Sequence, residues 1–185
     1  EWQKVKDSGA AGLVGLDVDQ NGNLIGKELP DSELINAASL LCVPGMGDKK
    51  YVVRNDLLRT VAPMPVFAGE KNFNPHYLIM KLSKQYRFHP VNQCFCLVEY
   101  QPDGMTANIW KQYVNSPRSF AELRLVIMDV PGLTWQYRLK NIIHYCSSSQ
   151  IAGNRNYIKE SPRKLLTVLC TPAGWVLTGY IRRKV

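Results

Sequence analysis

The order of apolar and polar positions in the first 61 residues predicts a hairpin followed by two short helices. Residues 12–18 (GLVGLDV) form an apolar run typical of a strand, and Gln-Asn-Gly-Asn at 20–23 is a strong turn signal. Residues 24–29 are then expected to form the returning strand. Asp31 or Ser32 is expected to cap a helix that ends near Leu41, and Asn55 is expected to cap a shorter one that ends at Val61.

The middle of the chain has a pattern typical of strands. Residues 63–75 contain three prolines and a glycine, which predicts a long exposed loop or a boundary within the structure. Beyond it, alternation of apolar and polar side chains favours strands, with a tight turn at Gln101-Pro102-Asp103-Gly104. The expected strands are residues 77–88, 94–101, 105–114 and 120–130.

The last third predicts one helix and one hairpin. Leu139, Ile142, Ile143 and Cys146 form a single apolar stripe, which predicts a helix over 135–145. Residues 147–162 are polar and predict a mobile loop. Residues 163–171 and 175–181 are expected to be strands joined by Pro172-Ala173-Gly174.

These elements together predict the fold class. We expect an α+β fold with a mainly antiparallel sheet, two or three packed helices and a C-terminal β-hairpin. The 185 residues suit a single domain, residues 1–185, with a possible boundary in the 63–75 segment. No apolar run approaches the ~18 residues that a membrane span needs.

Positive charge is concentrated at the end of the chain. The net charge is +8, and residues 131–185 hold nine Lys or Arg but one acid, Glu160, so residues 1–130 are neutral overall. Such asymmetry favours an anionic partner, either phosphates or lipid headgroups. The alternative is that the charge only keeps the protein in solution. If the terminal hairpin forms, it brings Arg163 and Lys164 beside the last three cations.

The candidate residues for binding an anionic surface are therefore the basic side chains of the 155–184 segment: Arg155, Lys159, Arg163, Lys164, Arg182, Arg183 and Lys184. Tyr157, Trp175 and Tyr180 are close enough in sequence to add aromatic contacts to nucleic-acid bases or to a lipid interface. The alternative is that these three aromatic residues lie in the core.

Signals for catalysis and for metal binding are weak. Five cysteines, an odd number set mostly in apolar runs, predict reduced thiols in a cytosolic or nuclear protein. Cys94 and Cys96 on one strand could share a metal ion with His89 or His144, but their apolar neighbours favour plain packing. Cys146 and His144 do not face each other on a helix, as a nucleophile and its base would. We therefore expect no metal, no cofactor and no enzymatic activity.

The C-terminal segment resembles the rhabdovirus matrix proteins. The resemblance lies in the strand pattern of residues 122–129, in Ile142-Ile143-His144-Tyr145 running into Ser147-Ser148, and in a terminal hairpin. The hairpin pattern consists of Lys164-Leu165-Leu166, Gly174-Trp175-Val176-Leu177 and Ile181. About a third of the chain is covered. A divergent member, from a plant rhabdovirus, would fit the absence of a Pro-Pro-x-Tyr budding motif.

The resemblance implies a viral structural protein that self-associates and bridges an anionic membrane and the nucleocapsid. It implies a location in the host cytoplasm, at the inner face of the membrane and in the virion, with the nucleus as an alternative. Polymerisation needs a contact between two different surface patches, and Met64, Val66 and Phe67 are our candidates for one of them. The alternative function is that of a viral RNA-binding protein, of the movement or silencing-suppressor type.

Overall fold

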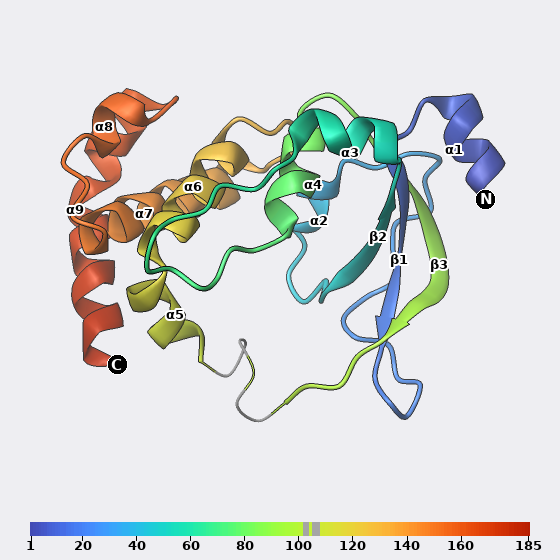
Figure 1. Cartoon of the computed structure of the whole chain (residues 1–185), viewed down its shortest axis with the longest axis horizontal. Helices are drawn as coiled ribbons and strands as arrows, with labels where there is room; N and C mark the ends of the chain where they lie inside the picture. Colours follow the sequence, from blue (N-terminus) through green and yellow to red (C-terminus); the bar gives the residue numbers. More distant parts are fainter. Residues whose placement is uncertain (102–103, 105–107) are drawn as a thin grey trace. The chain divides into compact units, whose positions relative to one another are not determined.

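The protein has an α+β fold, and the computed structural model describes residues 1–101, 104 and 108–185. The chain forms two compact units. The first, called the sheet unit, comprises Glu1–Pro63, Leu78–Gln101 and Pro131–Leu133. The second, called the helical unit, comprises Met64–Tyr77, Pro102–Val130 and Thr134–Val185. Figure 1 shows the order of the elements along the chain.

The sheet unit contains a three-stranded sheet in the order β2-β1-β3 (Figure 1). Its strands are β1 (Gly12–Val18), β2 (Lys49–Val53) and β3 (Phe88–Leu97). β2 runs antiparallel to β1, whereas β3 runs parallel to it. The sheet is therefore mixed, and the expectation of a mainly antiparallel sheet is wrong.

The central strand β1 is buried along nearly its whole length, which explains its run of apolar residues. Two of its glycines allow neighbours to approach closely. A Cβ atom at Gly12 would lie 2.0 Å from the carbonyl oxygen of Val52, and one at Gly15 would lie 2.2 Å from the Phe95 ring. Phe95 therefore covers the strand at the point where Gly15 leaves room for its ring.

Three helices accompany the sheet: α1 (Trp2–Ser8), α2 (Ala37–Leu40) and α3 (Asn55–Val61). The last ends at Val61 as expected, but its N-cap is Arg54 rather than Asn55, and no side chain caps it. α2 is shorter than expected because its N-cap is Asn36, four or five residues after the expected one; the Asn36 side chain accepts a hydrogen bond from the Ala38 backbone. The turn at 20–23 is present, but its returning strand is reduced to one bridge between Val18 and Leu24.

The expected strand over residues 77–88 is wrong. Residues His76–Leu82 form helix α4, and β3 begins at Phe88. The buried side chains Tyr77, Met80 and Leu82 lie on this helix rather than on a strand. β3 overlaps the expected 94–101 strand as far as Leu97.

The helical unit is built from α5 to α9. Their bounds are α5 (Ile109–Asn115), α6 (Pro117–Met128), α7 (Trp135–Ile151), α8 (Tyr157–Glu160) and α9 (Lys164–Arg183). The described residues thus hold nine helices, more than the two or three expected.

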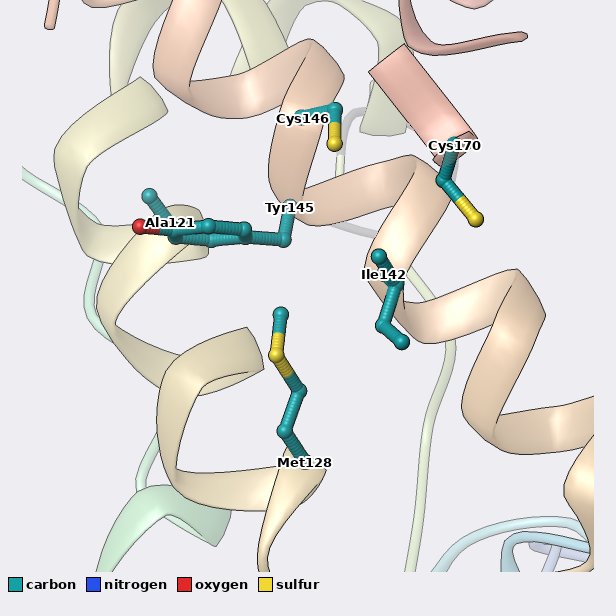
Figure 2. Packing of buried hydrophobic residues seen from close by; sticks show 6 residues of the cluster. All are labelled: Ala121, Met128, Ile142, Tyr145, Cys146 and Cys170. Carbon is teal, nitrogen blue, oxygen red and sulfur yellow. The ribbon is translucent and has the colours of Figure 1, made fainter. Parts of the chain in front are cut away.

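The core of the helical unit forms around Tyr145. Figure 2 shows the Tyr145 ring extending from α7 toward Ala121 of α6, with Met128 and Ile142 nearby. Tyr145 is fully buried, and its hydroxyl donates a 2.8 Å hydrogen bond to the Tyr157 carbonyl. This bond ties the segment after α7 to the core.

The expected strands over residues 105–114 and 120–130 are also wrong where the structure describes them. Residues 109–115 are helical, while 105–107 and most of the expected turn at 101–104 lie outside the described residues. In the second segment, Pro117 occupies the first turn of α6, where its missing N–H costs nothing. Phe120, Leu123 and Ile127 are buried at helical spacing. Burial of this face favours a helix over the strand that the alternation of apolar and polar residues predicts.

The helix predicted over 135–145 is confirmed and continues to Ile151 as α7. Its first turn is capped by the Thr134 side chain, which accepts a hydrogen bond from the Tyr137 backbone. The expected loop over 147–162 is therefore shorter, because the Ser147–Ser149 run lies inside α7 and α8 follows. The three serines are buried, so their polarity does not mark an exposed loop.

The predicted C-terminal β-hairpin is wrong, because residues 164–183 form the single helix α9. Pro172 lies inside this helix and is exposed, and Gly174 is buried against α7. The Pro172–Gly174 sequence therefore does not form a turn. The carbonyls of Thr167 and Gly174 accept additional hydrogen bonds from the Thr171 and Thr178 hydroxyls.

His144 in α7 predicts a dependence of stability on pH. Burial, with smaller effects of Arg124 and Lys140, lowers its pKa from 6.5 to about 4. The unfolded chain therefore binds this proton more tightly than the folded chain. The stabilisation by neutral His144 is complete above pH 6.5 and is lost as the pH falls toward 4, by about 3 kcal/mol.

Urea unfolding at pH 7.0 and 4.5 measures this loss. His144→Gln is expected to show a decrease in unfolding free energy over this interval that is smaller than the wild-type decrease by ~2–3 kcal/mol. Equal decreases in the two proteins would contradict the assignment.

Candidate membrane-binding helix

The buried face of α9 consists mainly of small and polar side chains, with Ile181 as a large apolar residue near its end. Thr167, Cys170, Gly174, Thr178 and Ile181 are its buried residues, spaced three or four apart. A Cβ atom at Gly174 would lie 2.5 Å from the Cβ of Cys146, so the two helices touch closely here. Small residues at this spacing let helix backbones approach one another.

Hydrogen bonds hold this small-residue face in place. The Thr178 and Ser147 hydroxyls are 2.9 Å apart, and the Thr178 hydroxyl oxygen lies 3.1 Å from the Gln150 side-chain amide. Nearer the start of α9, the Thr167 hydroxyl lies 2.6 Å from that of Ser161. The buried side of α9 is thus a hydrogen-bonded seam that also contributes Cys170 to the hydrophobic core and buries Ile181.

The opposite face of α9 is strongly apolar and exposed. Leu165, Leu169 and Val176 are 82%, 75% and 75% exposed, and Trp175 is 64% exposed. Val168 and Tyr180 are about half exposed on the same side, together with Pro172 and Ala173. We call this set the apolar face of α9. A helix on the surface of a water-soluble protein normally turns such a stripe inward, so this helix has the reverse arrangement.

The length and composition of α9 also suit a bilayer. Among the residues that the structure describes, it is the one helix that is long and apolar enough to cross a membrane, with a mean hydropathy of 1.2 over a window that is 33% buried. The expectation that no segment reaches this length is wrong. The reason is that Pro172-Ala173-Gly174, a sequence typical of a turn, lies inside the helix and does not divide the apolar run.

The predicted basic residues do not gather at one point, because the hairpin that would have joined them is absent. Arg163 and Lys164 precede the first turn or begin it, and Arg182, Arg183 and Lys184 end the helix. All five are exposed. A helix of 20 residues separates its ends by roughly 30 Å. The cations therefore flank the apolar face at both ends.

Arg155 and Lys159 lie in the segment that joins α7 to α9, and both are exposed. The Tyr157 hydroxyl is 3.0 Å from that of Thr171, and Ser161 contacts Thr167. This segment therefore follows the N-terminal half of α9. It places the cations of the 155–159 segment nearer the start of the helix than its end.

The cations at the start of α9 do not stabilise the helix. A helix N-terminus carries partial positive charge, and the first turn of α9 contains no acid and no side-chain cap. Arg163 is 3.9 Å from Asp129, but an exposed pair of this kind contributes little. Helix stability therefore gives no reason for basic residues here, which favours a role in binding.

The predicted aromatic contacts are divided between the core and the surface. Tyr157 is half-buried, with its hydroxyl at Thr171 and its ring near Tyr145. Tyr180 packs edge-on against Trp110, with the Lys184 ammonium 5.6 Å from its ring centre. Of the three, Trp175 is the most exposed, and it lies near the midpoint of α9 along the chain.

The predicted self-association residues are held by the loop that contains them. Phe67 stacks on Phe73 and is half-buried, as is Met64, whereas Val66 is 92% exposed. The Glu70 carboxylate anchors the loop by accepting hydrogen bonds from the backbone of Arg118 and Ser119 at the start of α6. Of the three, Val66 offers its whole side chain to a partner.

The candidate thiols and histidines do not form a reactive centre in the described part of the chain. Cys94 is exposed, and no group of three or more metal-ligating side chains lies together among the described residues. Burial raises the pKa of Cys146 to about 11, which keeps the thiol protonated near neutral pH and makes it a poor nucleophile. His89 instead contacts the Glu33 carbonyl and the Glu1 carboxylate.

The helical spacing of Leu165, Leu169, Pro172 and Val176 is the sequence signal that could have revealed the apolar face. Comparison of the chain with protein-family models, curated proteins and solved structures finds no match.

Proposed function

We propose that this protein is a peripheral membrane-binding protein that lies on anionic bilayers with the apolar face of α9 buried in the lipid interface. The observation that carries the proposal is the reversed amphipathicity of α9, with large apolar side chains outside and a hydrogen-bonded small-residue seam inside. Cations at both ends of the helix complement anionic headgroups.

An orientation in the plane of the membrane agrees with the packing of α9. Its buried face is held to α7 by contacts of Thr178 with Ser147 and Gln150. To cross the bilayer, α9 would have to break these contacts or bring α7 into the membrane with it. Lying flat, the helix exposes its apolar face to the acyl boundary while both groups of cations reach headgroups. Trp175 and Tyr180 are side-chain types that favour this depth.

The broader matrix-type role rests on the sequence resemblance. Self-association, with Val66 as its most available residue, and a bridge to a nucleocapsid or RNA remain predictions, as do the proposed locations and the lack of enzymatic activity. The segments on which the resemblance was based, 122–129 and 164–181, are helical in this protein. Membrane binding is proposed on the geometry of α9 alone.

Trp175 provides the test of this function. In vesicles of phosphatidylserine and phosphatidylcholine, brominated acyl chains should quench tryptophan emission, because the Trp175 ring enters the acyl boundary. Trp175→Phe should remove most of the quenching. The matched control is Trp135→Phe, which removes a tryptophan of equal exposure, 66% against 64%, outside the apolar face.

Quenching that survives Trp175→Phe unchanged would show that the apolar face does not enter the lipid. Absence of vesicle binding by the wild type would reject the proposal outright.

A further inference from the structure

A pocket of about 410 Å³ opens in the helical unit, between α6 and the end of α7. Ala121, Leu125 and Phe67 form its apolar wall, and Gly153 lies at its edge. Its polar side chains come from three separate segments of the chain: Arg118, Glu122, Ser149, Asn154 and Glu160.

Three side chains that line this pocket can accept hydrogen bonds: Glu122, Glu160 and Ser149. One carboxylate oxygen of Glu122 accepts from the Tyr77 hydroxyl, and one of Glu160 accepts from the Asn154 amide. The Ser149 hydroxyl has no hydrogen-bond partner among the described residues, and its residue is fully buried. A buried hydroxyl without a partner is costly, so its position calls for a ligand.

Tyr145 lines the same pocket as these three groups. Its pKa is raised, first by burial and to a smaller extent by the charges of Glu160 and Glu122, while Ser149 lowers it. The two carboxylates and the Ser149 hydroxyl thus belong to one cavity that also contains the Tyr145 ring. The contact of Ser149 with Tyr145 does not have the geometry of a hydrogen bond.

Three acceptors match the three N–H donors of a primary ammonium group. Two carboxylates beside one guanidinium give the pocket a charge opposite to that of a protein with a net charge of +8. Arg118 lies one turn before Glu122 on α6, and a guanidinium binds phosphate or carboxylate through paired hydrogen bonds. The ligand should thus carry an anionic group next to its ammonium group.

We propose that this pocket binds a small zwitterion in which a primary ammonium group neighbours a phosphate or carboxylate. The ammonium contacts Glu122, Glu160 and Ser149, the anionic group contacts Arg118, and the carbon chain lies against Leu125 and Phe67. Such a zwitterion is either a free metabolite or the headgroup of an ethanolamine lipid. The inference does not depend on the role of α9.

NMR titration of the ¹⁵N-labelled protein with O-phosphoethanolamine tests the site. The amides of Ser149, Ala152 and Gly153 should shift in a saturable manner. O-phosphocholine should bind at least tenfold more weakly, because its quaternary ammonium has no N–H donors. Equal binding of the two compounds, or no saturable shift, would overturn the proposal.

Two variants locate the ligand. Ser149→Ala removes one acceptor and should weaken phosphoethanolamine binding about fivefold without destabilising the fold, because the hydroxyl has no partner to lose. Ala152→Leu should fill the pocket and abolish binding. Glu28→Gln, an exposed acid of the sheet unit, is the matched control and should change nothing.

If thermal melting shows that Ala152→Leu is unfolded, Ser149→Ala decides the question alone. Unchanged affinity in Ser149→Ala would overturn the assignment of the pocket.

A vesicle experiment separates the two sources. With a constant fraction of phosphatidylserine, tighter binding to phosphatidylethanolamine than to phosphatidylcholine, lost in Ser149→Ala, identifies a lipid headgroup. Saturable binding of phosphoethanolamine without this preference identifies a soluble zwitterion. Both results support binding of a zwitterion in the pocket. If the protein did not bind vesicles through α9, the proposed function would fail, but binding of phosphoethanolamine in the pocket would still be expected.

Discussion

Replacing Leu165, Leu169 and Val176 together by Gln should lower the affinity for anionic vesicles by roughly a thousandfold. Burial of one such side chain is worth at least about 1.5 kcal/mol, so three contribute ~4 kcal/mol, and each 1.4 kcal/mol is a factor of about ten. The fold should persist, because all three are at least 75% exposed and Gln is a good helix former. Vesicle sedimentation measures the affinity.

The control removes exposed apolar side chains elsewhere. Val66 and Leu97 are 92% and 69% exposed, and the double variant Val66→Gln/Leu97→Gln should bind vesicles as the wild type does. A similar loss in both variants would mean that binding follows total exposed apolar surface, and the role of α9 would be rejected. Circular dichroism checks that α9 remains helical in the triple variant.

The sequence predicts those elements whose local pattern agrees with their tertiary packing. β1 is recognised because its apolar run is followed by a strong turn signal, and α7 because its apolar residues recur at helical spacing. β2 (KKYVV) has no such support, since it alternates half-buried and exposed residues. The parallel pairing of β1 with β3 joins residues more than 70 positions apart, and no local pattern reports it.

The two largest errors, at α6 and α9, have a common physical cause. A short apolar run fits both a strand and a helix, and the choice depends on what the rest of the fold buries. In α6, the alternation of Leu123, Leu125 and Ile127 concealed the helical spacing of the buried residues. In α9, Pro172-Ala173-Gly174 is typical of a turn between two strands, but the helix continues through it and has the proline on its exposed side.

The candidate site is affected by the same ambiguity. The seven basic residues are all exposed, as charged side chains usually are, and their role in binding an anionic surface stays a prediction. Their arrangement depended on the hairpin, so the cluster at one end became two groups at the ends of a helix. The apolar face of α9 has a sequence signal only when the segment is read at helical spacing, and the pocket beside Tyr145 could not be found without the helices that form it.

The last prediction concerns the cations at the end of α9. Replacing Arg182, Arg183 and Lys184 by Gln should weaken vesicle binding by about 3 kcal/mol, or more than a hundredfold, because each cation near an anionic surface contributes about 1 kcal/mol. The effect should shrink as salt rises, since the interaction is screened within a Debye length. Gln is preferable to Glu because negative charge would also destabilise a helix C-terminus.

The matched control neutralises an equal number of cations away from α9. Lys4, Lys6 and Lys27 are exposed in the sheet unit, and their triple Gln variant changes the net charge by the same amount. If it lost as much affinity as the α9 variant, the net charge rather than the position of the cations would control binding.

The same cations would also bind RNA, so competition separates the two functions. If the protein binds membranes, phosphatidylserine vesicles retain it in excess single-stranded RNA, because RNA phosphates compete for the cations but cannot replace the burial of the apolar face of α9 in lipid. On the nucleic-acid interpretation, RNA removes the protein from vesicles, and Trp175→Ala weakens RNA binding by ~1–3 kcal/mol through loss of a stacked base. Trp175 is the informative aromatic residue here, because Tyr157 is half-buried and hydrogen-bonded to Thr171, whereas Tyr180 packs on Trp110. If neutralising Arg182, Arg183 and Lys184 changes neither vesicle nor RNA binding, the basic end of α9 is only a solvated surface.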